Sequence, residues 1–186
     1  MKKFELTSET KINIFGKKLF RIKALISFAD VEAGETGGWV EKEGNVNQSG
    51  DAWVYGNAEV SGDAKVYGNA KVSGNAKVYG NAKVSVNAKV YGNAKVYGNA
   101  KVSGNAEVYG NAEVSDNADY TTIHGFGTQF RTTTFFRCKD KKVRVACGCF
   151  FGTIPEFREQ VKNTRKGKIA EEYLMIADLM EKHFEK

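Results

Sequence analysis

A six-residue unit, repeated without insertion, is the feature that most limits how this chain can fold. The unit reads Ala-Lys-Val-Tyr/Ser-Gly-Asn and keeps its phase from Ala52 to Ala118, and valine and glycine extend the phase back to Val40. Ala and Val alternate with Lys and Tyr or Ser, which predicts a strand of about four residues with Ala and Val inward, and Gly-Asn predicts a turn. The repeat therefore covers about residues 40–119.

Two architectures can use such a unit. In an antiparallel meander, Gly-Asn would form two-residue hairpin turns, but no other segment has the regularity needed to cover the apolar face of so wide a sheet. In a solenoid, each strand stacks in parallel on the next coil, so that Ala and Val share one core without a second layer. We therefore expect a solenoid.

The unit V-x-G-N-A-x resembles the hexapeptide repeat of left-handed parallel β-helix proteins. The preceding phrase GETGGWVEKEGNVNQSGDAWVYGNAEV resembles the start of such repeats in hypothetical proteins of bacteria and their phages. The resemblance implies three strands and about eighteen residues per coil, hence about four to five coils. We expect a mainly β protein with an N-terminal β cap at residues 1–39, a left-handed parallel β-helix at 40–119 and an α+β module at 120–186.

The flanking segments predict a hairpin at each end and two helices. The β-rich runs 12–15 and 19–28 predict a hairpin in the cap, and the runs 130–138 and 141–150 predict one in the C-terminal module. A T-x-x-E capping box at 153–156 begins a helix, and a second helix from about residue 168 has an apolar stripe that we expect to pack on the cap. The stripe consists of Ile169, Tyr173, Ile176, Met180 and Phe184.

Two positions break the repeat. Val86 stands where other units have Gly, and valine at a positive φ is an outlier, so we expect either a different turn there or a position that never required Gly. Asp116 occupies the same place in the final unit. We expect it to mark the exit from the coils.

An enzyme is the first functional hypothesis, because many hexapeptide-repeat proteins are CoA-dependent acyltransferases and some are carbonic anhydrases. The acyltransferases generally use a histidine base, but residues 40–119 contain no histidine and no long inserted loop. His124 is then the only plausible base, and two histidines cannot supply the three ligands of a carbonic anhydrase. Acyl transfer remains an alternative to the non-enzymatic, cofactor-free protein that we expect.

A metal site is the second chemical hypothesis, since Cys138, Cys147, Cys149 and His124 include the ligand types of zinc. Cys-Gly-Cys, however, lacks the two-residue spacing of zinc knuckles, and alternate strand positions would direct both thiols to one face. We expect buried, reduced cysteines and no bound metal.

The outward lysines are the first candidate binding surface. Lysines that only keep a solenoid soluble would give the same pattern. The functional alternative is a Lys/Tyr surface that binds nucleotides or other polyanions. Its flat contacts would be Tyr67, Tyr79, Tyr91 and Tyr97. A period of about eighteen residues stacks three sets. They are Lys65, Lys83 and Lys101; Lys71, Lys89 and Glu107; and Lys77, Lys95 and Glu113.

The predicted C-terminal hairpin is the second candidate surface. It interleaves basic residues with phenylalanines, and arginine beside aromatic rings favours phosphate groups or acidic protein surfaces. Core phenylalanines flanked by solvated charges would look the same. The basic residues are Arg131, Arg137, Lys139, Lys141, Lys142 and Arg144.

Charge and composition suggest the partner. The formal net charge is +6, and residues 120–186 carry 13 basic and 8 acidic residues against 8 and 9 in 40–119. We expect a cytoplasmic protein that binds a protein complex or another anionic macromolecule, and the phage resemblance suggests an inhibitor that occludes a host defence complex. Lysine rows lack the bidentate geometry of arginine, so sequence-specific nucleic-acid reading is not expected. No membrane partner is expected, and self-association would use the C-terminal helices.

Overall fold

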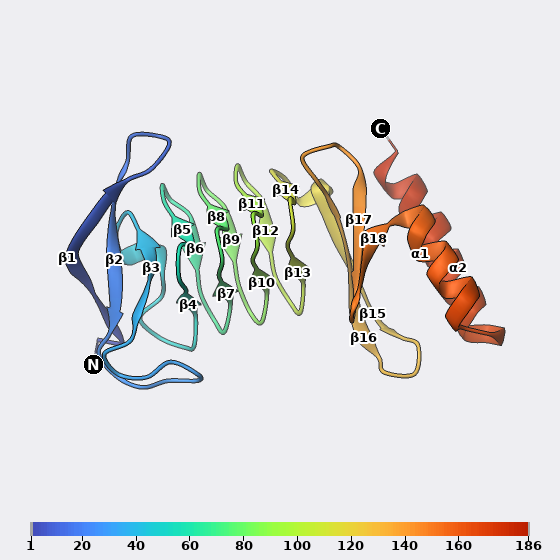
Figure 1. The fold of residues 1–186 in the computed structure, drawn as a ribbon, viewed down its shortest axis with the longest axis horizontal. Helices are drawn as coiled ribbons and strands as arrows, with labels where there is room; N and C mark the ends of the chain where they lie inside the picture. The colour runs from blue at the N-terminus through green and yellow to red at the C-terminus, as the bar shows by residue number, and fades with distance from the viewer. Residues whose placement is uncertain (1, 186) are drawn as a thin grey trace.

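The computed structural model describes residues 2–185, which form a parallel β-solenoid between an antiparallel cap and an α+β module (Figure 1). Two-residue strands follow one another every six residues from β4 (Trp53–Val54) to β14 (Glu113–Val114). They pair in parallel across eighteen residues, as Lys65 does with Lys83, so three strands make one coil and the predicted solenoid is confirmed. The other strands are β5 (Glu59–Val60), β6 (Lys65–Val66), β7 (Lys71–Val72), β8 (Lys77–Val78), β9 (Lys83–Val84), β10 (Lys89–Val90), β11 (Lys95–Val96), β12 (Lys101–Val102) and β13 (Glu107–Val108).

The Ala and Val of each unit form the core of the coils. Between Ala52 and Val114, every Ala and Val in phase with the repeat is 0% exposed. The corners use Gly at positive φ, and a Cβ added at Gly74 would lie only 3.0 Å from the backbone nitrogen of Gly92. A Cβ at such a corner would therefore be in tight contact with the backbone of the next coil, in addition to adopting a φ that favours glycine.

The corner at Val86 keeps the conformation of its glycine counterparts. Its φ is +61°, and its carbonyl accepts a hydrogen bond from the backbone N–H of Asn69 (2.7 Å), as the glycine carbonyls do at other corners. The turn is thus not different, and the valine occupies a left-handed conformation that favours glycine. Its side chain is 51% exposed.

The N-terminal cap contains the expected hairpin, but its first strand has different bounds from those predicted. Its strands are β1 (Phe4–Ile12) and β2 (Lys18–Ala24), so the first strand lies before the run 12–15. Ile14 and Phe15 are exposed in the connecting turn. The next strand, β3 (Thr36–Val40), pairs antiparallel with β2 and parallel with β5, which joins the cap to the solenoid.

The first coil would leave backbone carbonyls without hydrogen bonds, and donors from the cap satisfy them. On the β4 face, Lys3 Nζ donates to the carbonyls of Gly50 (3.0 Å) and Ala52 (2.8 Å). On the β6 face, Asn45 Nδ2 donates to the equivalent pair at 3.1 and 2.9 Å. On the β5 face, Arg21 and the backbone of β3 fill this role. The cap and the short segment 41–45 that follows β3 therefore close the edge of all three stacks.

The last coil has the opposite need, because its N–H groups lack a following coil. Asp116 caps the short 3-10 helix η2 (Asn117–Asp119), which leaves the coils where the exit was expected. Side-chain oxygens then accept from the unpaired N–H groups. The N–H of Lys101 donates to Asn117 (2.9 Å), that of Ser103 to Tyr120 (3.3 Å), that of Glu107 to Thr134 (3.1 Å) and that of Ser115 to Asp119 (2.9 Å).

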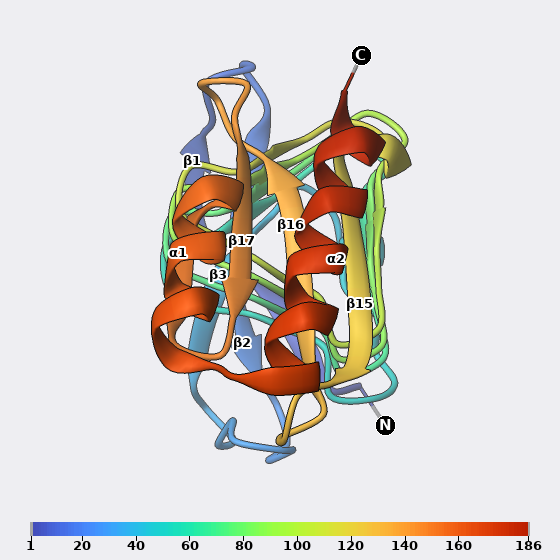
Figure 2. The same ribbon diagram turned by 90° about the vertical axis from the view of Figure 1, so that its right-hand side faces the viewer.

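The C-terminal module is a four-stranded antiparallel sheet covered by two helices. One face of the sheet closes the solenoid, and the helices lie on the other face (Figures 1 and 2). The predicted helices are confirmed. The apolar stripe of the second one packs on the outer face of this sheet and on α1, so the expected packing on the cap is wrong. The elements are β15 (Tyr120–Phe126), β16 (Arg131–Arg137), β17 (Val143–Cys147), β18 (Phe150–Thr153), α1 (Ile154–Thr164) and α2 (Gly167–Phe184).

The sequence predicted a two-stranded hairpin in this module, whereas the structure has a four-stranded sheet. The run 141–150 does not form one strand, because Gly148 at φ +60° makes a two-residue turn with Cys149 between β17 and β18. The segment 120–126, for which no strand was predicted, forms β15 at the sheet edge. No described helix is long and apolar enough to cross a membrane.

Candidate functional site

The six basic residues of the predicted C-terminal hairpin do not share one surface. The Arg137 guanidinium donates to the carbonyl of Phe184 (2.6 Å) and lies 3.5 Å from the Asp119 carboxylate. Arg144 donates to Asp140 (2.7 Å), and this hydrogen bond is the largest reason why the Asp140 pKa is lowered. Both arginines are thus occupied by contacts within the module.

The other four residues lie at the two ends of the sheet. Lys139, Lys141 and Lys142 are exposed around the β16–β17 turn, and none has an ion pair within residues 2–185. Arg131 begins β16, about 20 Å from that turn at ~3.3 Å per residue. The structure therefore brings the three lysines together but places Arg131 in another environment.

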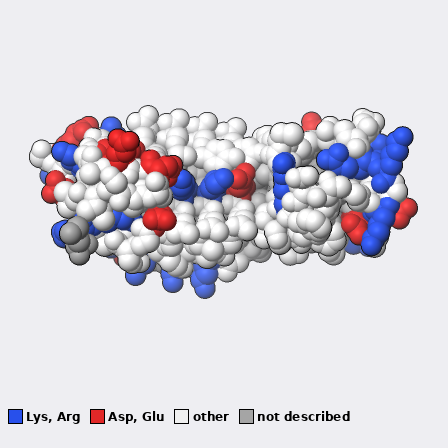
Figure 3. Space-filling view, turned by 90° about the horizontal axis from the view of Figure 1, so that it is seen from below, with Lys and Arg blue, Asp and Glu red and all other residues white. Residues whose placement is uncertain are grey.

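The predicted row of Lys65, Lys83 and Lys101 is formed as expected. The three residues are register partners on β6, β9 and β12, and all three are exposed. No carboxylate lies within 4.0 Å of their amines in the described part of the chain. We call this set the unpaired row, and Figure 3 shows basic side chains projecting in a line along one edge of the solenoid.

The lysines of the other two faces have carboxylate partners. Lys71 contacts Asp30 of the cap (2.6 Å) and Lys89 contacts the next residue of its stack, Glu107 (3.0 Å). On the third face, Lys77 and Lys95 contact Glu59 (3.4 Å) and Glu113 (3.0 Å). We call these four lysines the paired rows. In Figure 3 a second line of basic side chains ends beside acidic ones.

The tyrosines follow the same division. Tyr79 and Tyr97 stack with ring centroids 5.1 Å apart, and Tyr91 and Tyr109 stack at 4.6 Å, all on the faces of the paired rows. On the face of the unpaired row, Tyr67 is 37% exposed and the positions that follow it in the stack are serines. That face is therefore flat and rich in amines, with one aromatic ring.

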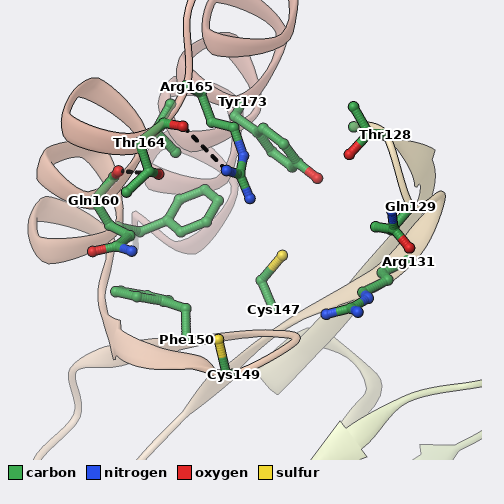
Figure 4. A pocket seen from close by; sticks show the side chains of 13 residues that line it. Thr128, Gln129, Arg131, Cys147, Cys149, Phe150, Gln160, Thr164, Arg165 and Tyr173 are labelled. Atoms are coloured by element: carbon green, nitrogen blue, oxygen red, sulfur yellow. Dashed lines mark hydrogen bonds between the residues drawn. The ribbon is translucent and has the colours of Figure 1, made fainter.

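Arg131 lines a cavity of about 120 Å³ between the sheet and the helices (Figure 4). Arg165, from the α1–α2 connection, lines the same cavity from the helical side, and Tyr173 of α2 lies between sheet and helices. The Tyr173 hydroxyl donates to the carbonyl of Phe126 (3.2 Å). Burial and the neighbouring Cys147 raise the pKa of Tyr173, and Arg165 and Arg131 oppose that rise.

Sequence reasoning missed Arg165 and Tyr173 as possible site residues. Tyr173 belongs to the apolar stripe, and Arg165 lies 34 positions from Arg131 in the sequence. The available signal was the basic run 162–168, which contains four Lys or Arg and no acidic residue. Figure 3 shows basic side chains gathered at the helical end of the molecule.

The candidates for chemistry lie apart from one another. His124 is exposed on β15, where its Nδ1 lies 3.2 Å from the Thr132 hydroxyl. Cys138 is buried at the end of the solenoid, whereas Cys147 and Cys149 line the Arg131 cavity. Within residues 2–185, no group of three or more His, Cys, Asp or Glu could hold a metal ion.

The outer face of α2 carries two exposed apolar side chains. Met175 is 70% exposed and Leu179, one turn later, is 58% exposed. Self-association through the C-terminal helices stays a prediction.

Comparison with known proteins adds no functional assignment. No protein-family model matches the chain, and no curated protein matches it significantly. The candidate surfaces are therefore ranked by their physical properties alone.

Proposed function

We propose that this chain is a non-enzymatic binding protein whose unpaired row contacts an acidic surface of a partner protein. The observation that carries the proposal is the contrast in charge balance between faces built from the same repeat. Four outward lysines have carboxylates within 4.0 Å, whereas Lys65, Lys83 and Lys101 have none among the described residues.

The unpaired row has an electrostatic cost that a partner would remove. Stacked strands place its amines on stems ~4.8 Å apart, where two unit charges repel by about 1 kcal/mol even in water. Solubility alone does not require this arrangement, because the paired rows also present charge on a β surface. Carboxylates of a partner would attract the three amines and so offset the repulsion between them.

An acidic protein fits this surface better than a nucleic acid does. Proteins that follow a single strand combine a long basic groove with open aromatic rings on which bases stack. Here the row spans three strands, about 10 Å, and most solenoid tyrosines stack on one another. The resemblance to proteins of bacteria and phages supports one particular form of the proposal. In this form the partner is a host defence complex, and the β-solenoid covers its active surface.

Binding of labelled polyglutamate, measured by fluorescence anisotropy at low salt, tests the proposal. One variant carries Lys65→Gln, Lys83→Gln and Lys101→Gln, and the matched variant carries Lys71→Gln, Lys89→Gln and Lys95→Gln. Each change lowers the formal net charge from +6 to +3, so only the position of the charge differs. We expect the first to weaken binding about tenfold or more and the second less than about threefold, since distant charges are screened.

Three results would overturn the proposal. They are no binding by the native chain, equal losses in the two variants, or tighter binding of a single-stranded DNA oligonucleotide that the unpaired row also controls. A third variant, with Lys139→Gln, Lys141→Gln and Lys142→Gln, removes the same charge from the β16–β17 turn. A loss confined to that variant would move the site to the C-terminal module.

A further inference from the structure

The Arg131 cavity is distinguished by the state of its two arginines. Most arginines of the chain lie within 4.0 Å of a carboxylate, whereas Arg131 and Arg165 have no such partner among the described residues. Both of them line the same cavity, and no acidic side chain is among its lining residues. The paired arginines are Arg21 with Glu9, Arg137 with Asp119, Arg144 with Asp140, and Arg158 with Asp178 and Glu181.

The lining of the cavity supplies further donors around these charges. Figure 4 shows Arg131 reaching in from the sheet and Arg165 from the helical side, with Cys147 between them. Thr128 and Gln160 add a hydroxyl and an amide, and the phenol of Tyr173, which donates to the Phe126 carbonyl, also lines the cavity. Phe150 and Phe157 also line the cavity, so part of it is apolar.

Two glycines let side chains that line the cavity lie close against the backbone. Both have positive φ, Gly127 at 71° and Gly148 at 60°. A Cβ at Gly127 would clash with the Tyr173 hydroxyl, and a Cβ at Gly148 would clash with the Arg131 guanidinium. The tight turns therefore let these two side chains lie close against the backbone.

The start of α2 follows Arg165 closely in the sequence and is not capped. The first helix is fully capped by Thr153 and Glu156, whereas α2 has no side-chain cap and no acidic residue in its first turn. It begins two residues after Arg165. An uncapped helix N-terminus carries partial positive charge, which favours an anion nearby.

We infer that this cavity binds the phosphate group of a small molecule. Two unpaired guanidinium groups match the charge and the bidentate geometry of a phosphate dianion better than those of a single carboxylate. At about 30 Å³ per water, the cavity has the room of about four waters, which suits a group of this size. The aromatic side chains would contact an apolar part of the same ligand.

Inorganic phosphate is the probe for the first test, by calorimetry on the full chain. We expect millimolar binding that weakens about tenfold or more in Arg131→Gln and in Arg165→Gln, since each removes a charged hydrogen-bonding partner. Lys162→Gln is the matched control, because it removes one charge from α1 outside the cavity lining. Its affinity should equal that of the native chain.

Alkylation of the cysteines by iodoacetamide reports binding at the site itself. Phosphate should slow the reaction of Cys149 and Cys147, which line the cavity, in the native chain but not in Arg165→Gln. Cys138, buried at the end of the solenoid, is the internal control. Absence of phosphate binding, an equal loss in Lys162→Gln, or tighter binding of acetate than of phosphate would overturn the inference.

Discussion

The β6–β9–β12 face and the β4–β7–β10–β13 face are built from the same six-residue unit, and both direct its Ala and Val into the core. They differ in what surrounds the lysines. On the second face, Asp30 of the cap and Glu107 at the far end neutralise the row. On the first face, Lys65, Lys83 and Lys101 have no carboxylate within 4.0 Å among the described residues. The repeat therefore sets the position of the lysines, and residues that depart from the repeat decide which of them have a carboxylate partner.

The same two faces differ at their N-terminal edge. Lys3 caps the carbonyls of the β4 face and Asn45 caps those of the β6 face, so one edge uses a titratable donor and the other a neutral one. Lys3 is 2% exposed, and burial lowers its pKa to about 8, against a small opposing effect of Asp51. The difference between the faces can therefore be followed with pH.

The largest expected effect concerns Lys3. Its folded pKa of about 8 lies below the unfolded value of 10.5, so between these pH values the unfolded chain holds a proton that the folded chain has lost. The contribution of this group to the free energy of unfolding then rises with pH between about 8 and 10.5, by about 3 kcal/mol in total, and is level below pH 8. Urea unfolding of the native chain and of Lys3→Met should give curves that separate over this range.

Asn45→Ala provides the control for that experiment. It removes an equivalent pair of hydrogen bonds on the other face, and its cost should not vary between pH 8 and 10.5, because an amide does not titrate there. Parallel stability curves for the native chain and Lys3→Met would contradict the account of the β4 edge.

An effect of about 1 kcal/mol is expected at the corner that follows β9. The left-handed conformation at Val86 costs about 1–2 kcal/mol, and Val86→Gly removes this cost. The greater conformational entropy of glycine in the unfolded chain offsets part of that gain. We expect a net increase in unfolding free energy of up to about 1 kcal/mol. Gly92→Val makes the reverse change at the corner after β10 and should be destabilising by more than this amount. Equal effects of the same sign would refute the strain at Val86.

The smallest effects compare single lysines. Lys83→Gln removes two repulsions in the unpaired row and should stabilise the fold by a few tenths of a kcal/mol at low salt. Lys89→Gln removes the ion pair with Glu107 and should destabilise it by a similar amount. Chemical unfolding at two salt concentrations measures both changes. The two values should converge as salt rises, and a gap that persists in high salt would show that charge is not its cause.

Much of the fold could be predicted from the sequence because each unit specifies its own strand, corner and inward face. The three lysine stacks follow from the same period. The strand break at Gly148 could not be predicted, since one glycine in an alternating run is compatible with either a strand or a turn. Strand β15 was missed for a related reason, because its burial pattern does not alternate cleanly.

The candidate sites depended on contacts that sequence period does not encode. Asp30 neutralises Lys71 only because the cap folds back on the solenoid, across 41 positions. Arg137 would be read as a surface charge, but the end of α2 returns to accept its hydrogen bond. Arg131 and Arg165 line one cavity only after β16–β18 and α1 have packed together. Long-range pairing of this kind requires the folded structure.

Amine labelling of individual lysines in the polyglutamate complex tests the central claim most directly. Acetylation rates of each lysine are measured by mass spectrometry with and without the bound polymer. The account predicts that Lys65, Lys83 and Lys101 become protected several-fold, whereas Lys71 and Lys89 keep their rates. Protection spread evenly over all exposed lysines, or concentrated at the β16–β17 turn, would contradict the claim that the unpaired row is the binding surface.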